Sequence, residues 1–138
     1  MSLLGFLKGF LGTSRLSEMA RGYLEAALWA AMDEDGYPLD RDYSLSDFST
    51  ETVAKAERDC QEFASANAEL YSRIGIGEDK AGHLFWLVRI GSGVSFTDDF
   101  KTGTVEMQIA KKLDTSARKY GEAHVMPNDE GELDIFTG

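Results

Sequence analysis

The fold of this chain depends most on one stretch, residues 82–96, whose sequence is GHLFWLVRIGSGVSF. Side chains of a strand alternate between two faces, and both faces are largely apolar here. One face holds Leu84, Trp86, Val88 and Ile90, and the other holds His83, Phe85, Leu87 and Arg89. Such a strand is typical of the middle of a sheet that helices cover. The GSG at residues 91–93 then predicts a tight turn and a return strand from Val94, so we expect an interior hairpin with Trp86 in the core.

Apolar residues spaced three and four apart predict three amphipathic helices around that hairpin. The first runs from Leu16 to Ala31, the second from Ser49 or Thr50 to Ile74, and the third from Val105 to Tyr120. Residues 122–136, EAHVMPNDEGELDIF, read as a second hairpin with its turn at residues 127–131. The predicted fold is therefore α+β. It is a single domain over residues 15–138, in which three main helices pack on a small antiparallel sheet of two hairpins, in the order α-α-ββ-α-ββ.

Residues 1–14 are predicted to be a separate apolar segment, which begins MSLLGFLKGFLG. This segment is shorter than the ~20 residues that span a bilayer, and it lacks the charged start and cleavage site of a signal peptide. As a short extra helix it would carry Leu3, Leu7, Phe10 and Leu11 on one face. Its three glycines make that helix unstable alone, so we expect it to dock on its own domain or on a second copy, giving a homodimer. A membrane surface is the weakest alternative, because the segment has a single Lys.

The composition argues against several classes of protein. The 138 residues carry a formal net charge of −10, and without clustered Lys and Arg we expect no direct binding to nucleic acid. A single cysteine, Cys60, excludes an internal disulfide and suits a reducing compartment, so we expect a cytoplasmic protein. Because Cys60 lies on the apolar stripe of a predicted helix, we expect it to be a small buried hydrophobic residue.

Negative charge is concentrated between residues 33 and 62, which hold ten acidic and three basic residues. The acidic residues in the first half of this range are Asp33, Glu34, Asp35, Asp40, Asp42 and Asp47. They either keep the protein soluble or bind a partner protein that has a basic surface. In the sharpest form of the second alternative, these carboxylates mimic DNA phosphates and block a host nucleic-acid-binding or defence protein.

No metal or cofactor is expected from these residues. With Gly36 at the sixth position of a calcium-binding loop, Ala31 would stand at the first ligand position, which excludes that motif. The two histidines, His83 and His124, start strands of separate predicted hairpins and have no further zinc ligands at motif spacing. Ser92 stands between two glycines but lacks the spacing of a hydrolase nucleophile.

One group of polar residues supports an alternative function, that of a small hydrolase or transferase. His83, Arg89, Asp98 and Asp99 could flank a shared groove beside the first hairpin. A purely structural arrangement instead pairs Arg89 with Asp98 or Asp99 across the hairpin, and satisfies His83 with a backbone carbonyl. The two interpretations differ in whether the four side chains converge on an open cleft.

The stretch as a whole resembles a known sequence pattern. GHLFWLVRIGSGVSFTDD is similar to G-H-x-F-W-L-x-R-x-G-x-G-x-x-F-x-D, found in small acidic bacteriophage and prophage proteins of unassigned function. The matching residues are Gly82, His83, Phe85, Trp86, Leu87, Arg89, Gly91, Gly93, Phe96 and Asp98. Residues 23–40 and 117–133 are similar to the same family, although Ser92, Thr97 and Asp99 depart from its usual residues. The resemblance implies a phage or mobile-element origin and a soluble intracellular accessory protein, and it implies no catalytic residues. Together with the acidic residues, this favours a protein that acts in the host cytoplasm by binding another protein.

Overall fold

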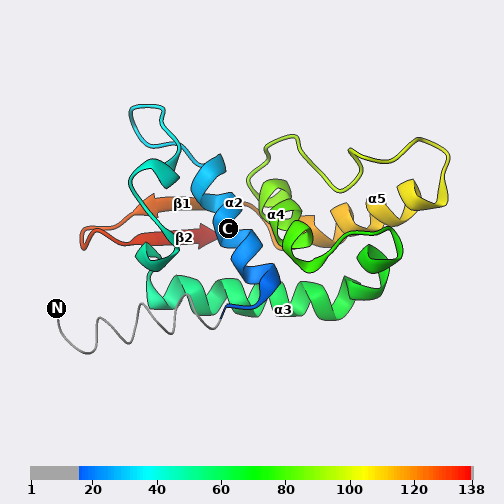
Figure 1. Ribbon diagram of the computed structural model, residues 1–138, viewed down its shortest axis with the longest axis horizontal. Helices are drawn as coiled ribbons and strands as arrows, with labels where there is room; N and C mark the ends of the chain where they lie inside the picture. The colour runs from blue at the N-terminus through cyan, green and yellow to red at the C-terminus, as the bar shows by residue number, and fades with distance from the viewer. Residues whose placement is uncertain (1–15, 138) are drawn as a thin grey trace.

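The computed structural model describes residues 16–137, which fold as four α-helices and one β-hairpin (Figure 1). The elements are α2 (Glu18–Ala30), η1 (Leu39–Arg41), η2 (Leu45–Asp47), α3 (Thr50–Arg73), α4 (Glu78–Arg89), α5 (Val105–Arg118), β1 (Ala123–Pro127) and β2 (Leu133–Thr137), where η denotes a short 3-10 helix. The α+β class is confirmed, as are the three predicted amphipathic helices and the second hairpin. The predicted segment 1–14, with Leu3, Leu7, Phe10 and Leu11, lies outside the described residues.

The three helices that the sequence predicted begin at hydroxyl side chains. Ser17, Ser49 and Thr104 are the N-caps of α2, α3 and α5, and each side chain accepts a hydrogen bond from a backbone N–H in the first turn. These bonds satisfy donors that a helix start otherwise leaves without partners. Among the helices of residues 16–137, none has the length and apolar character needed to cross a membrane.

The predicted first hairpin is wrong: residues 78–89 form helix α4, and residues 90–104 form a connection without strands. The GSG sequence ends this helix. Gly91 has φ +68°, its N–H donates to the Val88 carbonyl at 3.2 Å, and the Ser92 N–H donates to the Leu87 carbonyl at 3.2 Å. This pair of bonds satisfies carbonyls of the last helical turn. The period of two was misleading because α4 is buried on most sides, and an apolar run without a polar face fits a strand as well as a helix.

Replacing Gly91 by alanine tests this helix end. Its backbone is in the left-handed region, where a Cβ is strained, so we expect Gly91→Ala to lower the free energy of unfolding by about 1–2 kcal/mol. Gly91→Asn is the matched control, because asparagine tolerates this conformation better than alanine. Urea denaturation followed by circular dichroism measures both variants. If Gly91→Ala were as stable as the unmodified protein, Gly91 would not have the left-handed backbone conformation seen at the end of α4.

Helices α2 and α4 lie side by side in the centre of the molecule and make its most extensive helix contact (Figure 1). Gly22 on α2 and Gly82 on α4 lie where the two backbones meet. A Cβ added to Gly82 would overlap the carbonyl oxygen of Met19, and one added to Gly22 would overlap the carbonyl oxygen of Asp79. The two helices can approach this closely only because both residues lack a side chain.

Aromatic rings from three helices fill the core beside this crossing. Phe63 of α3 stacks on Phe85 of α4 with ring centroids 4.4 Å apart, and Tyr23 of α2 meets Trp86 edge-on at 5.1 Å. Tyr120, after α5, packs edge-on against Phe85 at 5.0 Å. Trp86 is fully buried, so its predicted place in the core is confirmed although its secondary structure was not. The ring contacts join α4 to elements on several sides.

The C-terminal hairpin is antiparallel, with Val125 opposite Ile135, and it is attached to the beginning of α3. Phe48 forms a parallel bridge with Leu133, and the Ser49 N–H donates to the Leu133 carbonyl at 2.9 Å. The Ser49 hydroxyl also donates to the Asp134 carboxylate at 2.5 Å. The last residues of the domain therefore help to fix the start of its longest helix.

Candidate functional site

The six acidic residues predicted to bind a partner lie in the connection between α2 and α3, and half of them hold its conformation. The Asp33 carboxylate accepts hydrogen bonds from the N–H groups of Asp35 and Tyr37 at 2.9 and 3.0 Å. Arg41 pairs with Asp42 at 3.1 Å and lies 3.6 Å from Asp33. The Asp47 carboxylate accepts a hydrogen bond from the N–H of Ser44, the N-cap of η2, at 2.7 Å. The other three acidic residues, Glu34, Asp35 and Asp40, are exposed.

Large apolar side chains are exposed in the same part of the chain. Trp29 near the end of α2 is 45% exposed, Met32 just after it is 59% exposed, and Tyr37 is 50% exposed. A bridge between Met32 and Pro38 folds these residues into a short loop, and the Arg41 guanidinium lies 4.0 Å from the centre of the Tyr37 ring. We call Trp29, Met32, Tyr37 and the acidic residues 33–47 the α2–loop surface. It combines exposed apolar groups with negative charge.

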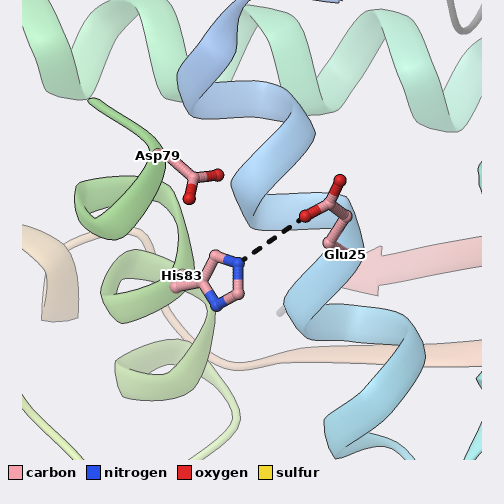
Figure 2. Close-up of side chains that lie close together, drawn as sticks. All are labelled: Glu25, Asp79 and His83. Atoms are coloured by element: carbon pink, nitrogen blue, oxygen red, sulfur yellow. Dashed lines mark ion pairs between the residues drawn. The ribbon is translucent and has the colours of Figure 1, made fainter. Parts of the chain in front are cut away.

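A second group of polar side chains lies between α2 and α4, next to their crossing. Glu25 comes from α2, while Asp79 and His83 come from the first turns of α4 (Figure 2). Nε2 of His83 is 3.9 Å from Oε2 of Glu25, and one ligand atom from each of the three residues lies within 4.8 Å of the others. The Trp29 ring centroid is 6.1 Å from that of His83. We call Glu25, Asp79 and His83 the interhelical cluster.

The interhelical cluster was not predicted, because His83 was expected on a strand and not on a helix. On a helix, Asp79 and His83 are four residues apart and so share one face, which alternation along a strand does not reveal. Glu25 joins them only because the glycines let α2 lie close to α4. The Asp79–His83 spacing was therefore the one signal in the sequence, and it is informative only once the helix is known.

Arg89 occupies the centre of a buried hydrogen-bond network. Nη1 donates to Asp59 Oδ2 at 3.0 Å and to the Tyr23 hydroxyl at 2.9 Å. Nε and Nη2 donate to the carbonyl oxygens of Gly121 and Tyr120 at 3.1 and 2.9 Å. The Arg89 side chain is 1% exposed, and burial raises the pKa of the Tyr23 phenol above its ordinary value although Arg89 opposes this shift. The guanidinium of α4 is thus hydrogen-bonded to α2, to α3 and to the residues after α5, so it connects four segments of the chain.

The four residues of the hydrolase alternative consequently do not share a cleft. The expected pairing of Arg89 with Asp98 or Asp99 is wrong, since its partner is Asp59. Asp98 accepts a hydrogen bond from the Ser95 N–H at 3.3 Å, and Asp99 forms an exposed ion pair with Lys80 at 2.9 Å. His83 faces Glu25, and a separation of six residues places it about 9 Å along the helix axis from Arg89.

Two other reactive side chains lie apart from the interhelical cluster. Cys60 is buried as predicted, and burial raises the pKa of its thiol well above the ordinary value, which disfavours the reactive thiolate. His124 is exposed on β1, where its Nε2 is 3.7 Å from Oε2 of Glu122. Neither residue supplies a ligand atom to the interhelical cluster.

In comparisons with known proteins, no family model, no curated protein and no solved structure matches the chain. The structure defines a small α+β protein in which two glycine-packed helices carry a cluster of two carboxylates and one imidazole. The likeness to phage proteins stays a prediction that rests on the sequence motif.

Proposed function

We propose that this chain is a phage-type accessory protein that acts in the host cytoplasm by binding a protein with a basic surface. The observation that carries the proposal is the α2–loop surface, where Trp29, Met32 and Tyr37 are exposed among acidic residues. Residues 33–47 contain six acidic residues and one basic residue, Arg41. Aromatic residues and methionine are enriched in protein interfaces, and surrounding charge selects a partner of opposite sign. A homodimer formed through residues 1–14 stays a separate prediction.

Neutralising the exposed carboxylates tests the proposal. We expect the triple variant Glu34→Gln, Asp35→Asn, Asp40→Asn to lose at least tenfold in affinity for the partner, because the charge that attracts a basic surface is gone. These three side chains are chosen because the bonds that hold the loop involve Asp33, Asp42 and Asp47 instead. Partners are captured from bacterial lysate, identified by mass spectrometry, purified and titrated against each variant by calorimetry.

A matched control removes the same amount of charge elsewhere. The variant Glu69→Gln, Asp129→Asn, Glu130→Gln changes three exposed carboxylates on α3 and in the hairpin turn, and we expect it to bind as the unmodified protein does. Binding by the unmodified protein should weaken with added salt, and Trp29→Ala should weaken it further because an aromatic anchor is lost. Equal loss in both triple variants, or capture that is indifferent to residues 29–47, would contradict the proposal.

DNA mimicry predicts, in addition, that the partner binds duplex DNA through the same surface. If the acidic residues replace phosphates, duplex DNA and this protein must compete for one surface of the partner, because each would occupy the basic groups that the other needs. Competition is measured with labelled duplex DNA. Simultaneous binding of both would exclude mimicry while leaving the protein–protein contact in place.

A further inference from the structure

The interhelical cluster brings together side chains that ligate metals. Asp79 and His83 project from successive turns of α4, and Glu25 approaches from α2 (Figure 2). The packing of the two helices also makes room for Asp79, since its Oδ1 lies 2.9 Å from the position that a Cβ of Gly22 would take. The absence of a side chain at Gly22 therefore allows one carboxylate to lie directly over the neighbouring helix.

We propose that Glu25, Asp79 and His83 bind one divalent ion of the zinc class. Zinc accepts imidazole nitrogen together with carboxylate oxygen, and its non-structural sites commonly use three protein ligands and leave a fourth position to solvent. Calcium prefers six to eight oxygen ligands and magnesium keeps most of its water, so one imidazole and two carboxylates suit neither ion. The chemistry of the ligands thus favours zinc over the abundant hard cations.

The geometry requires only small side-chain movements. Tetrahedral zinc with bonds of about 2.1 Å holds its ligand atoms roughly 3.4 Å apart, whereas the three ligand atoms here lie within 4.8 Å of one another. The side chains of His83 and Glu25 are 27% and 42% exposed, so they can rotate and an ion can enter from solvent. Their backbones are held in place by the Gly22–Gly82 crossing, which keeps the three ligands near one another.

An ion in this position would act on both helices. It would offset the repulsion between the Glu25 and Asp79 carboxylates and link the middle of α2 to the beginning of α4. Because a ligand that binds only the folded state stabilises it, zinc should raise the melting temperature. The Trp29 ring next to His83 provides a local optical signal, whereas Trp86 is fully buried in the core.

The test is titration of the full-length, chelator-treated protein with zinc chloride, followed by calorimetry and tryptophan fluorescence. We expect one ion per chain, a change in emission that Trp29→Phe abolishes without abolishing the heat, and a higher melting temperature. Magnesium chloride at the same concentrations should give none of these. Each of Glu25→Gln, Asp79→Asn and His83→Gln should weaken zinc binding roughly tenfold or more, since loss even of an outer-shell group typically has an effect of this size.

The chain supplies a matched control in His124 and Glu122, an exposed histidine–carboxylate pair separated by 3.7 Å. The variant Glu122→Gln, His124→Gln should bind zinc as the unmodified protein does. Circular dichroism identifies any variant that fails to fold, and the single variants that do fold then show whether the cluster binds zinc. Absence of zinc binding, binding that survives all the cluster variants, or an equal loss in the control would overturn the proposal.

Discussion

Gly82→Ala is expected to lower the free energy of unfolding by about 3 kcal/mol or more, a loss at the upper end of the range for overpacked cores. In an ordinary helix interior the same change would stabilise the protein by about 1 kcal/mol, because alanine is the better helix former. Here the new Cβ would overlap the Met19 carbonyl oxygen and would lie 2.9 Å from the Tyr23 nitrogen. These neighbours are backbone atoms of α2, so relief requires the two helices to separate.

Urea denaturation measures the loss, and two further variants interpret it. Gly22→Ala places a Cβ in the same crossing from the other helix and should have a similar effect. Gly77→Ala is the control: it lies at the N-cap of α4 with φ −80° and nothing within 4 Å of an added Cβ. Its effect should stay within about 1 kcal/mol. Equal or increased stability of Gly82→Ala would show that the α2–α4 packing is incorrect.

Removal of the buried guanidinium is expected to have the second large effect. Arg89→Met leaves the Asp59 carboxylate, whose side chain is 12% exposed, with only the exposed Arg58 guanidinium 4.0 Å away as an opposite charge. It also removes the guanidinium donors from the carbonyls of Tyr120 and Gly121. Breaking a buried ion pair from one side typically lowers the free energy of unfolding by about 3–5 kcal/mol. Urea denaturation should therefore show a strongly destabilised Arg89→Met protein.

Two comparisons separate a buried charge from a general loss of packing. The double variant Asp59→Asn, Arg89→Met should recover part of the loss, because no uncompensated charge remains. Lys80, also on α4, forms an ion pair with Asp99 that Lys80→Met breaks. Because these two side chains are 54% and 68% exposed, the free energy of unfolding should fall by only about 0–1 kcal/mol. An Arg89→Met protein no less stable than Lys80→Met would show that the network contributes little.

How far the sequence could predict this fold depends on how each helix is buried. Helices α2, α3 and α5 each leave polar residues on one side, so their apolar residues recur with a helical period. Helix α4 lies among its neighbours with Phe85, Trp86 and Leu87 all buried, and a run without a polar face has no readable period. Glu78 and Asp79 before the run and Gly91 after it were the helix signals available.

One of the two candidate sites could be predicted from the sequence and the other could not. The acidic connection between α2 and α3 could be found from composition, because negative charge along a loop is visible without knowing how the helices pack. The interhelical cluster could not, since Glu25 and His83 are 58 positions apart in the sequence and meet only through the contact at Gly22. The partner of Arg89 was likewise beyond prediction, because it is Asp59 on α3, 30 positions away, and not Asp98 or Asp99 just after the helix.

The bonds from Arg89 to residues 120 and 121 have a consequence for biosynthesis. Three of the segments that this side chain joins are translated early, but the carbonyls it needs belong to the last fifth of the chain. A nascent polypeptide on the ribosome can form its helices singly and can pair Arg89 with Asp59, yet Nε and Nη2 of the guanidinium lack their acceptors until those residues emerge from the exit tunnel. Final consolidation should therefore wait until residues 120 and 121 have left the exit tunnel, and chains interrupted before residue 120 should be substrates for chaperones and proteases.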